Sequence, residues 1–325
     1  MAFSADQLLE KVNTYLATMP YVREPKGLYA PIEYVLSLGG KRIRPVLMLL
    51  SYQLYKENVD DILPQAAGIE TYHNYTLLHD DLMDCADMRR NKPTVHKVWD
   101  ENTAILSGDA MLVLAYRLMN NCPERYLKQV MDIFSQTALE ICEGQQWDME
   151  FETRNDVTVP EYMEMIRLKT SVLLSAALKI GAVLGGASED DARKLYDFGI
   201  KMGLAFQLQD DYLDVYGDSK VFGKNIGGDI LCTKKTFMLI NALALADGIQ
   251  RKELEKWIAS TAFCPEEKIK AVTALYDKIG IGGICEEKIN AYYVEGLSLL
   301  ESIAVPSERK EELKSFVCHL MNRKV

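Results

Sequence analysis

The spacing of apolar residues along the chain predicts helices in nearly every region of this protein. Between Glu161 and Cys264 no proline interrupts the sequence, and apolar residues recur at helical intervals with few alternating β-branched positions. This pattern favours nearly continuous helices of roughly 15 to 20 residues. The glycine pairs Gly185-Gly186 and Gly227-Gly228 are the expected helix terminators in this region.

The first part of the chain has the same character. The apolar segment from Ile32 to Leu38 ends at Gly39-Gly40, and another apolar face runs from Gln65 to Met88, before a break at Asn91-Lys92-Pro93. No glycine-rich strand-turn-helix fingerprint, low-complexity linker, charge block or short-period repeat is present. We therefore expect an all-α fold in which residues 1–325 form a single domain.

Composition indicates a globular protein. The 325 residues are 48% hydrophobic with a mean hydropathy of −0.09, enough for one large core or two smaller ones. We expect no apolar run that approaches the roughly 18 residues of a membrane span. The start of the chain has no basic-then-apolar leader pattern, so we expect a cytoplasmic location.

Charge and cysteine usage exclude several classes of partner. A net charge of −10 and an isoelectric point near 5.1 argue against a general binder of nucleic acid or anionic membranes. The seven cysteines are scattered singly without a CxxC pair, which indicates neither a disulfide framework nor a zinc site.

Two copies of one acidic pattern carry the main functional signal. Asp80-Asp81-Leu82-Met83-Asp84 and Asp210-Asp211-Tyr212-Leu213-Asp214 each have mostly apolar flanks. On a helix, the first and last aspartates of each pattern share one face. Two such carboxylates ~5.5 Å apart repel by at most ~3 kcal/mol at an effective dielectric constant of ~20. Because a cation would reverse that penalty, and Mg²⁺ is usually held by carboxylates together with substrate phosphates, the pair predicts a magnesium-diphosphate site.

A solvated helix face would explain either acidic pattern if it stood alone. Repetition within apolar surroundings favours the functional interpretation, because unpaired carboxylates inside a folded domain are costly.

Basic residues close to the first pattern suit an anion. In the segment Gly39-Gly40-Lys41-Arg42-Ile43-Arg44-Pro45 one apolar stretch ends and another begins, and Pro45 biases Arg44 away from helix. Free amides at a helix start, together with lysine and arginine side chains, would attract a diphosphate. His73 lies seven residues before Asp80, on the same helical face, and could donate to a phosphate. Ordinary surface residues and a core histidine are the simpler alternatives.

Other polar residues are weak signals individually. Arg89-Arg90 follow the first acidic pattern by one to two expected helical turns, and Lys169-Thr170 and Gln207 lie on apolar helical stretches. Lys224 and Lys234 follow the second pattern and add positive charge. Surface ion pairs or solvated lysines would explain each of them alone.

Taken together and in order, these segments resemble the trans-isoprenyl diphosphate synthases, the polyprenyl synthetase family. The matching segments are GGKRIRP, HDDLMD followed by RRNKPTVH, KT, FQLQDDYLD, and GKNIGGDI leading to KKT. They run from Gly39 to Thr236, about three fifths of the chain. The resemblance implies an isoprenoid synthase-type helical prism around a deep central cavity, usually a homodimer, with the two acidic motifs facing each other across the mouth of the cavity.

The resemblance also implies a role for each matched residue. Asp80 and Asp84 would bind two Mg²⁺ ions and Asp210 a third, with Asp81, Asp211 and Asp214 in support. The allylic diphosphate would be held by Arg89, Lys169, Lys224 and Lys234. The isopentenyl diphosphate would be held by Lys41, Arg44, His73 and Arg90. The catalytic set would be Lys169, Thr170 and Gln207, of which the last two steady the allylic cation.

The implied reaction is a magnesium-dependent condensation of isopentenyl diphosphate with dimethylallyl, geranyl or farnesyl diphosphate. Metals and cationic side chains stabilise the departing diphosphate, the double bond attacks the allylic cation, and a proton is lost to the released diphosphate. Two departures from the family pattern are visible. Asn91 stands where the family commonly has glycine, and asparagine tolerates positive φ. The doubled Lys234-Lys235 leaves the phosphate ligand ambiguous, although spacing from Gly223-Lys224 favours Lys234.

Product length depends, in this family, on the fourth and fifth residues before the first acidic motif. These are Thr76 and Tyr75, and five residues correspond to ~7.5 Å along a helix, which would set Tyr75 below the metal site. An aromatic floor resembles short-chain synthases, so we expect farnesyl or geranylgeranyl diphosphate as the product. Ordinary core packing of Tyr75 is the alternative.

Two rival functions share part of this pattern. A class I terpene cyclase also ionises a diphosphate with magnesium, but it needs no isopentenyl site, so Lys41, Arg44 and His73 favour condensation. A non-catalytic subunit of a heteromeric prenyl synthase would tolerate the loss of one acidic motif, and both are complete here.

Overall fold

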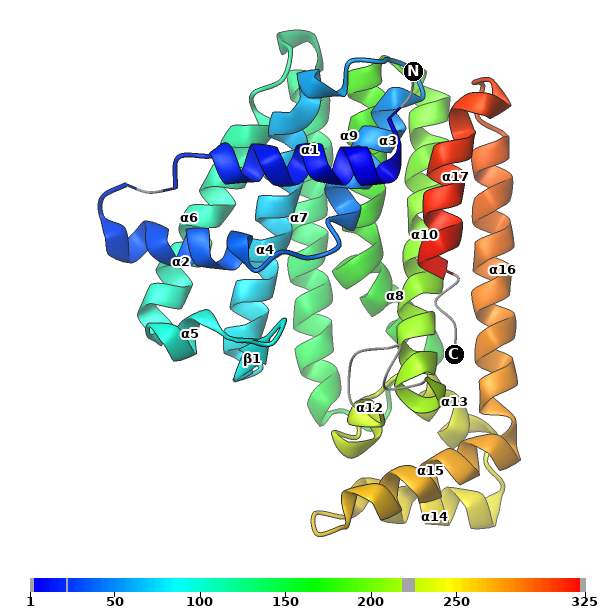
Figure 1. Ribbon diagram of the computed structural model, residues 1–325. Helices are drawn as coiled ribbons and strands as arrows, with labels where there is room; N and C mark the ends of the chain where they lie inside the picture. Colours follow the sequence, from blue (N-terminus) through cyan, green and yellow to red (C-terminus); the bar gives the residue numbers. More distant parts are fainter. Residues whose placement is uncertain (1–2, 22, 218–225, 322–325) are drawn as a thin grey trace. The chain divides into compact units, whose positions relative to one another are not determined.

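The computed structural model describes residues 3–21, 23–217 and 226–321, and nearly all of its regular structure is helical (Figure 1). This confirms the predicted all-α class. The chain folds into two compact units that interleave in sequence. Unit 1 comprises Met1–Gln136, Ala176–Tyr196 and Ile303–Leu313, and unit 2 comprises Thr137–Ser175, Asp197–Ser302 and Lys314–Val325. The single domain expected from the sequence stays a prediction.

Unit 1 is organised around α4 (Leu63–Met83), the helix that carries the first acidic motif. It packs against α6 (Glu101–Met119) and α3 (Ile43–Gln53), and α2 (Lys26–Ser37) packs on both α4 and α6 (Figure 1). The other elements that lie wholly in unit 1 are α1 (Ala5–Thr18), η1 (Val59–Ile62), β1 (Met88–Arg89), β2 (Lys92–Pro93) and α5 (Val95–Val98).

Unit 2 contains the second acidic motif. Elements wholly within it are α8 (Val159–Ile166), η2 (Arg167–Ser171), α12 (Gly228–Leu231), α13 (Phe237–Leu245), α14 (Gly248–Ala259), α15 (Pro265–Ile279) and α16 (Ile281–Glu301). Helices α14 and α15 lie side by side (Figure 1). Both units contain parts of α7 (Glu124–Thr153), α9 (Val172–Gly185), α10 (Glu189–Tyr216) and α17 (Ser307–Met321).

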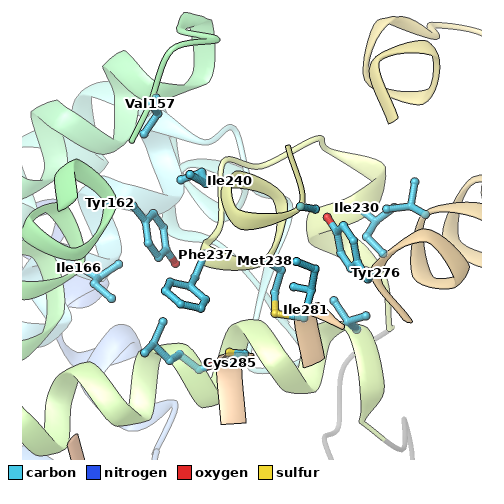
Figure 2. Close-up of a cluster of buried hydrophobic side chains, with 14 of the residues drawn as sticks. Val157, Tyr162, Ile166, Ile230, Phe237, Met238, Ile240, Tyr276, Ile281 and Cys285 are labelled. Carbon is cyan, nitrogen blue, oxygen red and sulfur yellow. Dashed lines mark hydrogen bonds between the residues drawn. The ribbon is translucent and has the colours of Figure 1, made fainter. Parts of the chain in front are cut away.

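A buried hydrophobic cluster in unit 2 brings its short helices together. Figure 2 shows Tyr162 of α8 close to Phe237 and Met238 of α13, with Ile230 of α12 near Tyr276 of α15. Full burial of side chains of this size contributes about 1.5 to 3 kcal/mol each. The cluster therefore anchors the elements that surround the second acidic motif.

Local sequence signals start several helices. In α1, α8 and α14 the residue before the helix and the third residue of the helix form capping boxes, as in Thr158 with Glu161. Each box satisfies two backbone amides that have no partner inside the helix.

The predicted helix from Gln65 to Met88 is too long at its C-terminal end. Helix α4 ends at Met83, and the chain then forms the two-stranded antiparallel hairpin of β1 and β2. Cys85, Arg90 and Asn91 have φ values of 51°, 52° and 61°, a conformation that a helix cannot contain. The apolar spacing continues past Met83, so the end of the helix is not visible in the apolar pattern. Asn91 adopts positive φ, as expected for a residue that replaces glycine at this turn.

Glycine pairs terminate two of the three predicted helices. Gly39 and Gly186, with φ of 74° and 87°, follow α2 and α9 as expected. Gly227, with φ of 82°, precedes α12 and does not end α10, which stops at Tyr216 and has 28 residues. The predicted helix length was therefore too short for α10.

The expected bias of Arg44 away from helix was wrong. Helix α3 begins at Ile43, so Arg44 lies in its first turn and Pro45 occupies the next position. A proline is tolerated there because the first backbone amides of a helix have no internal acceptor.

One stretch, Val159–Gly185, is long and apolar enough to cross a membrane by length and composition, which corrects the expectation of no such run. Its most apolar window is 83% buried inside the protein. This burial identifies the stretch as part of the folded core.

Candidate active site

The first acidic motif occupies the last turn of α4. The amide of Asp84 donates to the carbonyl oxygen of Asp80 at 2.9 Å, so the helical spacing is kept through the motif. Asp80 is half-buried and Asp84 is exposed. The two carboxylates thus lie one turn apart at the end of the helix, as predicted.

Asp81, the middle carboxylate, binds an arginine of the following hairpin. Arg89 Nε donates to both carboxylate oxygens of Asp81 at 2.7 Å, and its Nη2 lies 2.7 Å from Oδ1. The same Nη2 is 3.9 Å from Asp80. Because charge-assisted arginine contacts of this geometry are strong, they hold the hairpin against the end of α4.

Arg44 and His73 form a direct contact in unit 1. Arg44 Nη1 lies 3.0 Å from His73 Nε2, and Arg44 Nε is buried without a hydrogen-bond partner among the described residues. Since a guanidinium only donates, Nε2 of His73 must accept, and the proton of the neutral ring resides on Nδ1. Burial and the charges of Arg44 and Arg90 hold the pKa of His73 well below its usual value.

Arg90 joins Arg44 and His73 in a basic group of unit 1, and it contacts the loop at Gly39-Gly40. Its guanidinium donates to the carbonyl oxygen of Gly39, and a Cβ at Gly40 would lie 2.8 Å from Arg90 Nη2. With φ of 134°, Gly40 is also in a conformation that other residues rarely adopt. Burial lowers the pKa of Arg90 and lowers that of Arg44 to about 10. Three of the four residues expected to bind isopentenyl diphosphate therefore lie together, and Lys41 is exposed on the adjoining loop.

Arg42 has a structural role that the sequence did not reveal. It is buried and forms a 2.7 Å salt bridge with buried Glu70, and it also donates to the carbonyl oxygen of Leu36 at 2.6 Å. Asn74 donates to the same Glu70 carboxylate at 3.0 Å. In the sequence Arg42 was indistinguishable from its basic neighbours, because its acidic partner is 28 residues away.

Tyr75 lies within a row of aromatic rings. Its ring centroid is 4.9 Å from that of His79 and 5.5 Å from that of Tyr72, and the ring of Tyr72 is 5.2 Å from Phe134. Thr76 donates its hydroxyl to the carbonyl oxygen of His73 at 2.8 Å. Tyr75 is half-buried, so both chain-length control and ordinary packing remain consistent with its position.

The second acidic motif lies near the end of α10. Asp214 Oδ2 accepts from the amide of Asp229 at 3.0 Å, which joins the motif to the start of α12. Asp210 is half-buried. Asp214 therefore has one carboxylate oxygen engaged by the chain itself.

Asp211 is the centre of a polar network. It is 4% exposed, and it accepts hydrogen bonds from the Tyr162 hydroxyl, the Phe237 amide and Gln207 Nε2. Thr170 donates to the other end of the Gln207 amide at 3.3 Å. Burial raises the pKa of Asp211 to about 7, and the Tyr162 hydrogen bond opposes that rise. The network joins Thr170 and Gln207 to the second acidic motif.

Lys169 lies on a π-helical turn, η2, and contacts an acidic residue missed by the sequence analysis. Its ammonium is 2.6 Å from Asp148 of α7, a residue 21 positions earlier in no recognisable acidic pattern. Although burial alone would raise it, the charges of Lys234 and Lys169 hold the pKa of Asp148 below its usual value. π-Helical turns are frequent at functional sites.

Two glycines allow the π-helical turn to dock. A Cβ at Gly144 would lie 2.5 Å from the Lys169 amide nitrogen, and a Cβ at Gly203 would lie 2.6 Å from Ser171 Cβ. Helices α7 and α10 can therefore approach η2 closely only because both positions lack side chains.

Lys234 and Lys235, the two candidate phosphate ligands, have different surroundings. Lys235 Nζ reaches the carbonyl oxygen of Glu152 at 3.4 Å. Lys234 is exposed, and its charge lowers the pKa of both Asp148 and Asp211. Lys234 as the phosphate ligand stays a prediction. Lys224 falls outside the described residues.

The donor set fits magnesium better than a metal held by protein alone. Across the described ranges, no three His, Cys, Asp or Glu side chains are placed to hold an ion by themselves. Mg²⁺ is usually bound through one or two carboxylates, with substrate phosphates supplying further oxygens. In unit 1, Asp80 and Asp84 are donors of the kind that this arrangement uses, and in unit 2 so is Asp210.

An all-helical fold with two DDxxD motifs and two groups of cationic side chains defines a class of enzymes that act on prenyl diphosphates. The protein belongs to the polyprenyl synthetase family, whose sequence profile matches residues 25–276. It is 41% identical over 273 residues to the short chain isoprenyl diphosphate synthase of Methanocaldococcus jannaschii, covering 84% of this chain and 83% of that protein. The chain is thus a prenyltransferase of the short-chain type.

Solved structures of such synthases have the same fold as this chain. A geranylgeranyl pyrophosphate synthase superposes with a TM-score of 0.91 and 44% identity, over 99% of this chain and 98% of that one. The geranylgeranyl pyrophosphate synthase of Corynebacterium glutamicum, solved with isoprenyl diphosphate and magnesium, gives a TM-score of 0.87 and 26% identity, over 99% and 100% of the two chains.

Proposed function

We propose that this protein condenses isopentenyl diphosphate with an allylic diphosphate and releases geranylgeranyl diphosphate, with farnesyl diphosphate as the shorter alternative. The observation that carries the proposal is the contact of Arg44 with His73 beside Arg90, in addition to the acidic motifs. Such a cluster supplies a second anion site, which a reaction of two diphosphate substrates requires.

The basic group of unit 1 would bind isopentenyl diphosphate. The buried Nε of Arg44 has no acceptor among the described residues, and an unsatisfied buried donor costs about 1 to 3 kcal/mol. A diphosphate oxygen would satisfy it. Neutral His73 would add a donor at Nδ1, and Lys41 and Arg90 would add positive charge.

The basic residues near the acidic motifs would hold the allylic diphosphate. These are Arg89, Lys169 and Lys234, with Lys224 as a further expected ligand. Arg89 and Lys169 are already held by Asp81 and Asp148, so their charges are fixed before substrate arrives. Preorganised charges of this kind stabilise a leaving group without reorganisation during the reaction.

Thr170 and Gln207 would lie beside the developing allylic cation. Their oxygens carry partial negative charge, and the Asp211 network fixes their orientation. Isopentenyl diphosphate then supplies the attacking double bond, and the released diphosphate takes the proton.

Magnesium, in the expected three ions, would neutralise the diphosphate and lower the barrier to its departure. Asp80, Asp84 and Asp210 would hold the ions. Asp81, Asp211 and Asp214 would support these ligands through Arg89, Tyr162 and the amide of Asp229.

Assembly as a homodimer is part of the proposal. Helix α6 exposes large apolar side chains, with Leu106 and Val113 each 60% exposed and Ile105 46% exposed. Leu106 and Val113 are seven residues apart and so share one face of the helix. Covering this face with a second copy would remove it from water. Analytical ultracentrifugation tests the dimer, and a monomer at micromolar concentration would contradict it.

Product analysis tests the function. Purified protein is supplied with magnesium, labelled isopentenyl diphosphate and, separately, dimethylallyl, geranyl or farnesyl diphosphate. We expect labelled geranylgeranyl diphosphate from at least one starter. Release of a cyclic hydrocarbon without isopentenyl incorporation would identify a terpene cyclase, and no turnover by the protein alone would favour a non-catalytic subunit.

A further inference from the structure

A buried lysine on α15, Lys268, holds the segment that leads to Lys234. The residue is 2% exposed. Its ammonium donates to the carbonyl oxygen of Leu231 at 3.2 Å and to the hydroxyl of Thr233 at 2.9 Å. Both acceptors lie within three residues of Lys234, where α12 ends.

Stability alone does not explain a cation in this place. Both hydrogen-bond acceptors are neutral, and no carboxylate within the described ranges pairs with Lys268. The ammonium of Lys268 also lies over the ring of Phe263, 4.3 Å from the ring centroid. Burial lowers the pKa of Lys268, and a buried cation without a carboxylate is costly to folding.

The one-turn helix α12 is held at both ends. At its start, Asp214 of the second acidic motif accepts from the amide of Asp229 at 3.0 Å, and the Asp214 carbonyl oxygen accepts from Gly227 at 2.6 Å. At its end, Lys268 binds Leu231. Ile230 of α12 also packs near Tyr276 of α15 (Figure 2). Movement of α12 is therefore opposed from the acidic motif and from α15.

The contacts of Lys268 bracket the turn that sets the direction of Lys234. Thr233 has φ of 56°, and the amide of Lys234 donates back to the carbonyl oxygen of Asp229 at 2.9 Å. Lys234 and Lys268 line one small cavity of about 20 Å³, together with Asp229 and Thr233. A space of this size admits about one water molecule. Without the ammonium of Lys268, this turn would lose two of its tertiary hydrogen bonds.

We propose that Lys268 is a positioning residue for the allylic substrate, because it holds the turn at Leu231 and Thr233 that directs Lys234 toward the diphosphate. The inference rests on the proposed function, in which Lys234 contacts that diphosphate. Lys268 itself does not touch the substrate and acts only through Lys234.

Steady-state kinetics with Lys268→Met test the inference. This change keeps most of the apolar stem and removes the ammonium. We expect the KM for the allylic diphosphate to rise about 10-fold, the size typical for loss of a supporting contact, with the KM for isopentenyl diphosphate unchanged. Thr233→Ala, which deletes only the hydroxyl acceptor, carries the test if Lys268→Met does not fold, and it should raise the same KM by a smaller factor.

Lys56→Met is the matched control. Lys56 makes the same kind of contacts in unit 1, with its ammonium 3.2 Å from the carbonyl oxygen of Leu184 and 5.7 Å from the ring centroid of Tyr52. It should leave both KM values unchanged. A merely structural role of Lys268 would lower the melting temperature of Lys268→Met and leave its KM values at those of the wild type, which overturns the positioning role.

A double-mutant cycle with Lys234→Ala decides whether Lys268 acts through Lys234. We expect the double variant to have the allylic KM of Lys234→Ala alone, because the side chain to be positioned is absent. Independent effects that multiply would overturn the inference, and so would an unchanged allylic KM in Lys234→Ala. Wild-type protein that forms no prenyl product would instead overturn the proposed function itself.

Discussion

Arg89 donates from Nε to both carboxylate oxygens of Asp81, at 2.7 Å each. This contact joins the hairpin after α4 to the last turn of the helix. The middle aspartate of the first motif therefore holds an arginine, whereas Asp80 and Asp84 flank it at the helix end. We therefore expect Asp81 to position Arg89, and Asp80 and Asp84 to bind magnesium.

Substitutions in the first motif should separate these roles. Asp80→Asn and Asp84→Asn are expected to lower kcat/KM by about 10² to 10³-fold and to raise the magnesium concentration needed for half-maximal rate. Asp81→Asn should release Arg89, raise the KM for the allylic diphosphate and leave the magnesium requirement closer to that of the wild type. Magnesium titrations of initial rate measure this. Equal shifts in all three variants would show that Asp81 is a metal ligand of the same kind.

Removal of the Tyr75 ring should lengthen the product. Tyr75→Ala opens space beside His79 and Tyr72, so the growing chain can extend by at least one further five-carbon unit. Mass analysis of the products measures the change. Tyr75 and Tyr29 both pack, partly buried, against one hydrophobic cluster of unit 1, so Tyr29→Ala is the control and should leave the product unchanged. An unaltered product from Tyr75→Ala would assign Tyr75 to core packing.

Acid should destabilise the protein through His73. Its pKa is lowered in the folded state, so the unfolded chain binds the proton first as pH falls below about 6.5. Stability is therefore lost between that value and the lower folded pKa, and it is unaffected above it. When the pH is lowered from about 7.5 to 5.5, the melting temperature of His73→Asn should fall less than that of the wild type. His319→Asn is the control, because His319 is exposed, and it should behave like the wild type.

The buried pair of Arg42 and Glu70 should be sensitive to loss of one partner. Glu70→Gln leaves the guanidinium without its carboxylate, 2.7 Å away, and is expected to lower the free energy of unfolding by about 3 to 5 kcal/mol. Replacement of both residues, as in Arg42→Met with Glu70→Leu, should recover part of that loss. Urea unfolding measures both, and a single variant as stable as the wild type would contradict the prediction.

A side chain at Gly144 should disturb the turn that carries Lys169. The Cβ of Gly144→Ala would lie 2.5 Å from the Lys169 amide nitrogen, so the π-helical turn must shift. A displacement of this kind is expected to reduce kcat by about 10²-fold. Gly283→Ala on α16 is the control, because its Cβ would meet no atom within 4 Å. Wild-type kcat in Gly144→Ala would show that the turn tolerates the shift.

Much of the helical framework follows from the sequence alone. Apolar spacing predicts the helices because one face of each must be buried, and this holds for α4 and α10 with their acidic motifs. The turns at Gly39, Gly186 and Asn91 were also predictable, since few residues adopt positive φ. Each of these features depends on residues within about one helical turn of one another.

Sequence by itself therefore determined the class, the two acidic motifs and the basic residues close to them. Tertiary structure alone decided which partner each charged group has: Arg42 binds Glu70, Lys169 binds Asp148, and Tyr162 binds Asp211. The physical reason is distance along the chain. These partners are 21 to 49 residues apart, and only the packing of separate helices brings them within hydrogen-bonding range.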